Sequence, residues 1–274
     1  MNTELVKITI DDCDEKYNKA VELLQNEEVV GMPTETVYGL AGNAFSPLAV
    51  SRIFEAKGRP TDNPLIVHIS EFSEIYDLVK VVPETAKKLA EKFWPGPLTM
   101  ILPKSDKVPL CVTAGLNTVA VRCPAHHIAN KLIKVAGIPL AAPSANLSGK
   151  PSPTTANHVK TDLDGKISLV VDGGICCHGV ESTVVTVKDN KVTILRPGFI
   201  TAEDFESEGF TAEYSKGVFD ELEKGEKALS PGMKYKHYSP KANVIILDGD
   251  YEKVKEFSKT IKEDDVYFLL FNED

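Results

Sequence analysis

The chain has 274 residues, of which 42% are hydrophobic and 26% are charged, so it can form one large domain or one domain with a smaller companion. Its formal net charge of −9 argues against a protein whose main task is to coat nucleic acid, although a small basic pocket remains compatible with it. The N-terminus lacks the pattern of a signal peptide, no apolar run is long enough to span a membrane, and the five cysteines form no disulfide framework. These features predict a cytoplasmic protein without membrane association.

Helical and strand-like patterns alternate along most of the chain, which is typical of α/β and α+β domains. Helices are predicted at Tyr17–Gln25, from the cap Ser46–Pro47 to Lys57–Gly58, at Pro83–Phe93 and at Ile128–Val135. Strands are predicted at Val29–Met32, Leu65–Ile69, Leu98–Leu102, Val119–Arg122, Leu140–Pro143, Leu169–Asp172, Thr183–Val187 and Val192–Leu195. The last two strands should form a hairpin that turns at Asp189–Asn190.

The composition changes after residue 206. Ser207–Lys227 has weak periodicity, and Ser230–Pro240 (SPGMKYKHYSP) has neither a helical nor a strand period, so both belong to a predicted linker. A β-α-β pattern then follows at Asn243–Leu247, Tyr251–Ile261 and Val266–Phe271, and so short a unit cannot cover both faces of its own sheet. The predicted organisation is a main domain at 1–206, a linker at 207–241 and a partial second domain at 242–274.

Several cations stand where predicted elements end, next to glycine or proline. They are Lys57 and Arg59 in the sequence KGRP, Arg122 at the end of a strand, and Arg196 in the sequence RPG. At such positions the backbone can approach a ligand closely. In an acidic chain, several such cations together favour a polyphosphate or carboxylate ligand over solvated surface charge. Neither the P-loop nor the dinucleotide fingerprint is present, so a nucleotide would bind in another way.

Other candidate residues leave two interpretations open. Ser144 and Asn146 follow a strand two positions apart, where they could bind a substrate oxygen or simply form a helix cap or a turn. His68 ends a strand and, taken alone, is better explained as a surface residue than as a ligand contact. Cys176–His178 lacks a C-x-x-C partner and is a poor metal site. Ser182 is not in a G-x-S-x-G elbow, which argues against a hydrolase nucleophile.

Taken in order, the motifs resemble the YrdC-like family of threonylcarbamoyl-AMP synthases. They are Pro33–Leu40 (PTETVYGL), Lys57–Pro60 (KGRP), Asn63–Leu65 with His68, Ser144–Asn146, Ser182–Val184 and Arg196–Gly198. The segment Ser230–Pro240 is similar to the linker of the family's long form, which adds a Rossmann-like domain. The resemblance implies a twisted, open mixed α/β sheet with a concave positive cavity, followed by the linker and a partial Rossmann-like β-α-β unit. That second domain is expected to be shorter than in the long form.

The resemblance also implies an activity. The enzyme would be an L-threonylcarbamoyladenylate synthase, a nucleotidyltransferase that makes threonylcarbamoyl-AMP and pyrophosphate from L-threonine, bicarbonate or CO₂, and ATP with Mg²⁺. Its product would pass to the proteins that transfer the threonylcarbamoyl group to tRNA, and a weak tRNA contact is expected. Two other classes compete with this interpretation. One is a non-enzymatic module that binds double-stranded RNA or tRNA, and the other is the related carbamoyl-transfer domain of hydrogenase maturation proteins.

Site residues follow from the resemblance, position by position. Residues implied around L-threonine are Thr36, His68, Arg122, Ala142 and Ser182. Residues implied around ATP are Arg59, Asn63, Thr118, Ser144, Asn146, Ser152, Arg196 and Tyr235. Lys57 and Arg59 are assigned to catalysis, because cations can neutralise the phosphates as pyrophosphate leaves. No general base is apparent, and no metal held by the protein alone is expected.

The predicted linker has an unusual centre. It carries Lys234, Tyr235, Lys236, His237 and Tyr238 in succession. Aromatic faces and cations of this kind can cover a nucleotide and lie near its phosphates, so the segment is expected to act as a lid that excludes water. The alternative is a solvated tether that happens to be basic.

Overall fold

The computed structural model describes residues 2–218, 245–247, 250–262 and 266–267. The chain divides into two compact units, Met1–Tyr238 and Ser239–Asp274, and each is described by itself. Within the described ranges, no helix is long and apolar enough to cross a membrane.

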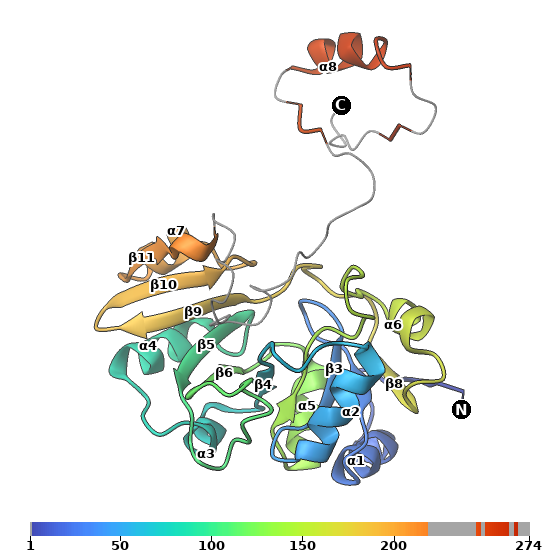
Figure 1. Ribbon diagram of the computed structural model, residues 1–274, viewed down its shortest axis with the longest axis vertical. Coiled ribbons are helices and arrows are strands. Elements are labelled where there is room, and N and C mark those ends of the chain that lie inside the picture. The colour runs from blue at the N-terminus through green and yellow to red at the C-terminus, as the bar shows by residue number, and fades with distance from the viewer. Residues whose placement is uncertain (1, 219–244, 248–249, 263–265, 268–274) are drawn as a thin grey trace. The chain divides into compact units, whose positions relative to one another are not determined.

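One mixed sheet forms the framework of the first unit (Figure 1), with the strand order β1-β8-β2-β3-β7-β4-β6-β5-β9-β10-β11. Its strands are β1 Glu4–Lys7, β2 Val30–Met32, β3 Gly39–Asn43, β4 Ile66–His68, β5 Leu98–Pro103, β6 Thr118–Arg122, β7 Leu140–Ala141, β8 Leu169–Asp172, β9 Thr183–Lys188, β10 Lys191–Arg196 and β11 Thr211–Tyr214. Strand β4 runs parallel to β6 and antiparallel to β7, so the predicted mixed sheet is confirmed. The predicted hairpin is β9–β10, and Asp189 at its turn has a positive φ of 53°.

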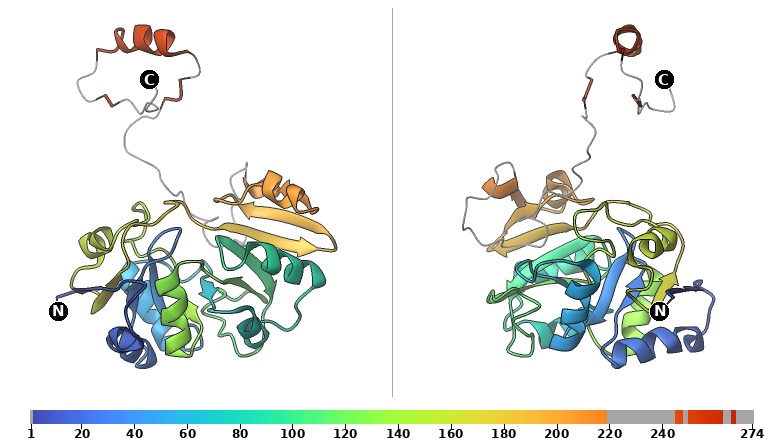
Figure 2. Two further views of the ribbon diagram at one scale, coloured as in Figure 1. Left: turned by 180° about the vertical axis from the view of Figure 1, so that it is seen from behind. Right: turned by 45° about the vertical axis from the view of Figure 1, so that its right-hand side comes forward.

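Helices cover the sheet and connect its strands (Figure 2). They are α1 Asn18–Gln25, α2 Pro47–Lys57, α3 Ile75–Leu78, α4 Glu84–Phe93, α5 His127–Ala136, α6 Ala156–Leu163 and α7 Ala202–Ser207, with 3₁₀ turns at Asp14–Tyr17, Phe72–Glu74 and Lys216–Val218. Helix α1 packs against α5, and α2 packs against β3.

Helix α2 has well-defined ends, which fix the cations at its C-terminus. The Ser46 hydroxyl accepts a hydrogen bond from the Ala49 backbone N–H at 3.1 Å, and Pro47 occupies the first helical position. At the other end Gly58 adopts the left-handed conformation with φ 57°, which terminates the helix. Lys57 is therefore the last helical residue, and Arg59 follows the reversal of the chain.

Two clusters of buried apolar side chains pack on opposite faces of the centre of the sheet. Leu40 belongs to one cluster and Ala41 to the other, and Ala141 and Leu140 are divided in the same way. Because successive side chains of a strand point to opposite faces, the clusters pack on the two faces of β3 and β7. Strand β3 was not predicted, since burial on both faces removes the alternation that marks a half-exposed strand.

Two parts of the predicted organisation need correction. Thr211–Tyr214 lies in the range predicted as a linker, yet it forms β11 and pairs in parallel with β10, so the sheet extends past residue 206. In the second unit, α8 (Tyr251–Ser258) lies within the predicted helix, whereas residues 245–247 and 266–267 form no strand. A strand needs a paired neighbour to be stable. The rest of those two predicted strands and the linker segment Ser230–Pro240 lie outside the described residues.

Candidate functional site

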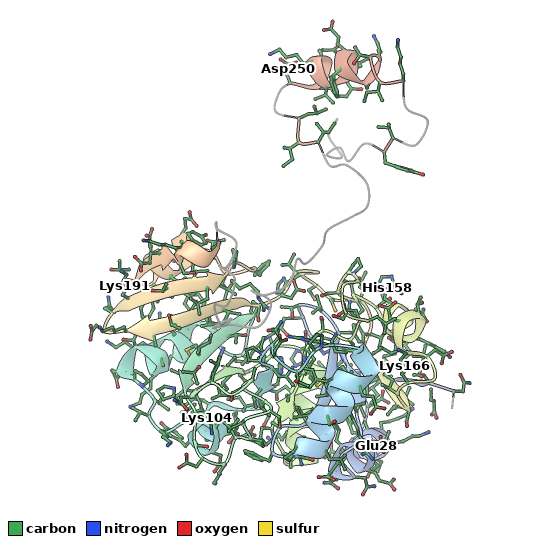
Figure 3. The ribbon with its side chains drawn as sticks, in the orientation of Figure 1. Glu28, Lys104, His158, Lys166, Lys191 and Asp250 are labelled. Carbon is green, nitrogen blue, oxygen red and sulfur yellow. The ribbon has the colours of Figure 1, made fainter. Side chains whose placement is uncertain are left out.

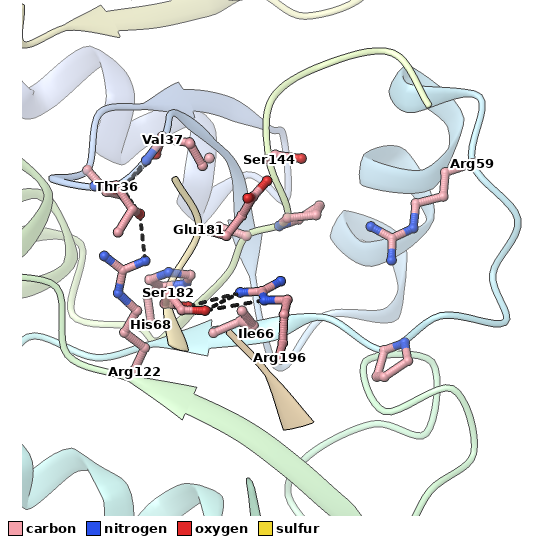
Figure 4. A pocket seen from close by; sticks show the side chains of 15 residues that line it. Thr36, Val37, Arg59, Ile66, His68, Arg122, Ser144, Glu181, Ser182 and Arg196 are labelled. Carbon is pink, nitrogen blue, oxygen red and sulfur yellow. Dashed lines mark hydrogen bonds between the residues drawn. The ribbon is translucent and has the colours of Figure 1, made fainter. Parts of the chain in front are cut away.

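A pocket lies over the centre of the sheet, where β3, β7, β4 and β6 are neighbours (Figure 4). All five residues predicted around threonine line it. They are Thr36 between β2 and β3, His68 at the end of β4, Arg122 at the end of β6, Ala142 after β7 and Ser182 before β9. Three residues predicted around ATP line the same pocket, namely Arg59, Ser144 and Arg196. The pocket therefore brings together residues from motifs spread over most of the first unit.

Arg122 is a buried cation of the pocket that is held on three sides. Its Nη2 lies 2.6 Å from Glu35 Oε1, and the two side chains are only 4% and 7% exposed. The contact is a close ion pair rather than an aligned hydrogen bond. Arg122 also donates from Nη1 to Thr36 Oγ1 at 2.9 Å and from Nε to the Gly96 carbonyl at 3.3 Å. Contacts on three sides fix the plane of the guanidinium, which can then offer a defined edge to a carboxylate.

Glu35 stays ionised although it is buried. Burial raises the pKa of this carboxyl, whereas the nearby charge of Arg122 and a backbone hydrogen bond from Ala125 lower it. The lowering effects together outweigh burial, so the pKa of Glu35 lies below the ordinary value. The residue was quoted as part of the PTETVYGL motif but was not predicted as a site residue. Glu35 and Arg122 lie far apart in the sequence, so no local pattern could predict that they form an ion pair.

The Thr34–Val37 segment is locked by its own hydrogen bonds. Thr34 Oγ1 donates to the Val37 carbonyl at 2.6 Å and accepts from the backbone N–H groups of Thr36 and Val37, each at 3.2 Å. The hydroxyls of Thr34 and Thr36 lie 2.9 Å apart. Because Thr36 Oγ1 also accepts from Arg122, this turn sets the position of both groups in the pocket.

His68 lies beside Arg122 because β4 and β6 pair in parallel with these two residues in register. It is 3% exposed, so the interpretation as a surface residue is wrong. Burial, helped by the charge of Arg122, lowers the pKa of His68 to about 3. The imidazole is therefore neutral near pH 7, and its Nδ1 has no hydrogen-bond partner in the structure. A neutral ring in this setting can form a hydrogen bond with a ligand but adds no charge to the pocket.

Ser182 and Arg196 form one unit at the start of β9. Arg196 donates from Nη2 to the Ser182 carbonyl at 2.8 Å and to Ser182 Oγ at 3.1 Å, and Thr99 Oγ1 lies 2.7 Å from the same hydroxyl. Gly198 packs directly on this backbone, because a Cβ there would lie 2.4 Å from the Thr183 nitrogen. The glycine of the RPG motif is thus needed for close approach.

Lys57 does not line the pocket but lies behind it. It is 2% exposed, and its Nζ donates to the Ser144 carbonyl, to the Asn146 carbonyl at 2.7 Å and to Asn146 Oδ1 at 3.3 Å. The Asn146 amide is oriented by its own donation to the carbonyls of Leu147 and Lys150, at 2.8 and 2.7 Å. Burial, with a smaller effect of the Arg59 charge, lowers the pKa of Lys57 to about 7. These contacts fit a positioning residue better than a direct contact to phosphate.

Of the other residues predicted around ATP, none that the structure describes lines the pocket. Asn63 is 1% exposed and its Oδ1 has no hydrogen-bond partner in the structure, while Thr118 begins β6. Ser152 Oγ donates to Glu181 Oε1 at 2.6 Å, and Glu181 itself lines the pocket although it was not predicted. Tyr235 and the proposed lid lie outside the described residues.

The cysteines show no sign of a metal centre. Across the described ranges, no group of three or more His, Cys, Asp or Glu side chains could hold a metal ion. His178, which follows two cysteines, instead stacks on Phe199 with ring centroids 3.7 Å apart. The absence of a structural zinc stays a prediction, which elemental analysis of the purified protein would check.

Comparison with known families accounts for nearly the whole chain. A family model for the Sua5, YciO and YrdC proteins, described as telomere recombination, matches residues 22–198. A second model, described as the C-terminal domain of threonylcarbamoyl-AMP synthase, matches residues 200–274. The two matches follow one another along the chain.

Individual relatives agree with the family models. The chain is 50% identical over 245 residues to threonylcarbamoyl-AMP synthase of Pyrococcus abyssi, an alignment that covers 88% of this chain and 70% of the relative. It is 53% identical over 243 residues to the Bacillus subtilis protein of the same name, with 88% and 69% covered. The crystal structure of P. abyssi Sua5 complexed with L-threonine superposes with a TM-score of 0.88 at 47% identity, covering 94% of this chain and 75% of that one.

Proposed function

The chain is an enzyme of the YrdC-like family of threonylcarbamoyl-AMP synthases, and we propose that it condenses L-threonine, bicarbonate or CO₂, and ATP into threonylcarbamoyl-AMP and pyrophosphate. The observation that best supports this proposal is the division of charge in the pocket. Arg122 and Arg59 lie on opposite sides of it, with Arg196 between them (Figure 4). Such a pocket can hold a carboxylate at one end and phosphates at the other.

Threonine would bind at the Arg122 end. The fixed guanidinium would pair with its carboxylate, while Thr36, His68 and Ser182 offer hydrogen-bonding groups for the side-chain hydroxyl and the amine. The Cα of Gly39 and the methyl of Ala142 leave little room behind the substrate, since a Cβ on Gly39 would lie 3.2 Å from the Ala142 Cβ. Since polar groups left unpaired in a buried site are costly, this end should reject an amino acid without a hydroxyl.

The chemistry would then need two bond-forming steps. The threonine amine attacks the carbon of bicarbonate and expels water, which gives a carbamate. A carbamate oxygen next attacks the α-phosphorus of ATP, and pyrophosphate leaves. Arg59 and Arg196 would stabilise the charge on the phosphates, and Mg²⁺ bound to ATP would supply further neutralisation.

His68 is the single histidine among the described residues that line the pocket, and it is not suited to act as a general base near neutral pH. The imidazole of His68 is too weakly basic, because burial lowers its pKa to about 3. Catalysis would therefore depend on the orientation of the substrates and on fixed positive charge. We further propose that the product is handed to proteins that transfer the threonylcarbamoyl group to tRNA.

Pyrophosphate release is the direct test. The purified chain should release pyrophosphate from ATP when L-threonine and bicarbonate are both present, and replacing threonine with L-valine should lower the rate by about a hundredfold or more. Equal rates with valine would contradict the assignment of the threonine site. Tight binding of tRNA without any pyrophosphate release would instead favour the RNA-binding module, for which the net charge of −9 gives no support.

A further inference from the structure

Glu181 is an acidic residue in a pocket that is also lined by three arginines. Among the residues described around the pocket it is the single acidic side chain, and it shares the pocket with Arg59, Arg122 and Arg196. Figure 4 shows its carboxylate between Ser144 and Arg196. No pattern in the sequence marked it as a site residue.

The position of Glu181 is fixed by both its side chain and its backbone. Ser152 Oγ donates to Oε1 at 2.6 Å, which orients the carboxylate. Behind it, Gly198 packs so closely that a Cβ there would lie 2.5 Å from the Glu181 carbonyl oxygen. A serine predicted around ATP therefore holds this carboxylate, and the RPG motif that carries Arg196 supports its backbone.

A carboxylate that lines the pocket would repel the phosphates of ATP, and a cation bound between the two groups would turn that repulsion into attraction. Mg²⁺ is commonly held by one or two protein carboxylates together with substrate phosphates and water. Two oxygen donors that line the pocket, the Glu181 carboxylate and the Ser144 hydroxyl, are of the hard type that Mg²⁺ prefers. Since the described residues contain no group that could hold a metal alone, the ion would have to arrive with the nucleotide.

We infer that Glu181 is the protein carboxylate that contacts the Mg²⁺ accompanying ATP, with Ser152 as the residue that positions it. The inference rests on the proposed function, because it requires ATP in this pocket. It predicts that removing the charge of Glu181 weakens the binding of the metal in the ternary complex while leaving the threonine end intact.

Binding of Mn²⁺ in place of Mg²⁺ tests this without relying on turnover. Free Mn²⁺ is measured by electron paramagnetic resonance in mixtures of the full chain and ATP, for the wild type, Glu181→Gln and the matched control Glu213→Gln. Glu213 is an exposed acid on β11 that pairs with Lys191 at 2.7 Å and does not line the pocket. Threonine binding is measured separately by calorimetry, and circular dichroism checks the fold.

In E181Q the affinity of the protein–ATP mixture for Mn²⁺ should fall about tenfold, with threonine affinity unchanged, and the control should match the wild type. Unchanged Mn²⁺ affinity in E181Q would overturn the inference. So would a loss of threonine affinity alone, which would place the threonine ammonium at Glu181. If E181Q does not fold, Glu181→Asp should weaken Mn²⁺ binding by moving the carboxylate, and unchanged binding would again overturn it. A wild type that neither binds ATP nor releases pyrophosphate would show instead that the proposed function is wrong.

Discussion

Glu35 Oε1 lies 2.6 Å from Arg122 Nη2, so the arginine that faces the pocket carries its counter-ion behind it. Both side chains are removed from water, and the carboxylate stays charged because the attraction of Arg122 outweighs the cost of burial. The pair lets a full positive charge stand in the interior of the protein. It also orients the guanidinium before a ligand arrives, which saves the cost of ordering it during binding.

Glu35→Gln should destabilise the protein strongly, because it leaves Arg122 buried without a counter-ion. The free energy of unfolding is expected to fall by about 3–5 kcal/mol, measured by urea unfolding at pH 7. Glu28→Gln is the matched control, since Glu28 pairs with Arg52 at 3.1 Å where the two side chains are 39% and 32% exposed. Figure 3 shows Glu28 on the outside of the protein. An exposed pair is worth about 1 kcal/mol or less, so equal losses in the two variants would contradict a special role for Glu35.

Acid should destabilise the wild type through His68. The folded pKa of about 3 lies below the ordinary value of 6.5, so between these values the unfolded chain binds more protons than the folded one. Stability is therefore lost as the pH falls from about 6.5 towards 3. His68→Gln should flatten this part of the curve of stability against pH, measured as urea midpoints from pH 7 to pH 4. The same substitution at the exposed residue His127 is the matched control. An unchanged slope in H68Q would show that His68 takes up its proton in the folded state.

Glu35 adds a second loss of stability at lower pH. Its folded pKa lies below the ordinary value of 4.5, so its contribution is present above that value and is lost as the pH falls through the folded pKa. In E35Q the extra decline of unfolding free energy below about pH 4.5 should disappear, although the variant starts from a lower stability at neutral pH. If E35Q declines as steeply as the wild type in that range, another carboxylate is responsible.

The sequence predicted which residues lie in the pocket, but it did not predict the contacts that hold those residues in place. Motif order led to Thr36, His68, Arg122 and Ser182, and the structure places these residues in one pocket. The pairing of Glu35 with Arg122 could not be foreseen, because it depends on how β2, β3 and β6 lie in the sheet and not on any local pattern. Lys57 and Ser144 likewise stand 87 positions apart in the sequence.

The strands β3 and β11 were missed for different physical reasons. Strand β3 has the sequence GLAGN and is buried on both faces, so it lacks the alternation and the β-branched residues by which strands are recognised. Strand β11 is short and mostly exposed, and its stability comes from pairing with β10. By contrast, α2 was predictable at both ends, because its Ser-Pro start and Gly stop act locally.

Lys57→Met should loosen the segment that carries Ser144. Methionine fills a similar volume but removes the lysine donor from the carbonyls of Ser144 and Asn146 and from Asn146 Oδ1, and of these acceptors Oδ1 keeps a second donor, the Ser144 hydroxyl. The loss should cost about 1–3 kcal/mol of unfolding free energy. Turnover should fall because Ser144 lines the pocket. A positioning role predicts that the KM for ATP and kcat both worsen, while L-threonine affinity, measured by calorimetry, stays near that of the wild type. A Lys57→Met protein with wild-type kinetics would show that the segment holds its place without the lysine.

Arg59→Ala should abolish most of the activity and leave the fold intact. The side chain lines the pocket after the end of α2, is half-buried, and would meet the phosphates, where removing one preorganised cation typically costs about a hundredfold or more in turnover. Arg52→Ala is the matched control, because Arg52 lies on the helix α2 that precedes Arg59, pairs with Glu28 on the surface and does not line the pocket. Pyrophosphate release, thermal midpoint and threonine affinity should be compared for both variants.

A large loss of turnover in R59A with an unchanged thermal midpoint would show that Arg59 acts in the reaction and not in the fold. If R59A and R52A lose activity equally, or if R59A unfolds, the cation serves the fold instead and the phosphates must be neutralised elsewhere in the pocket.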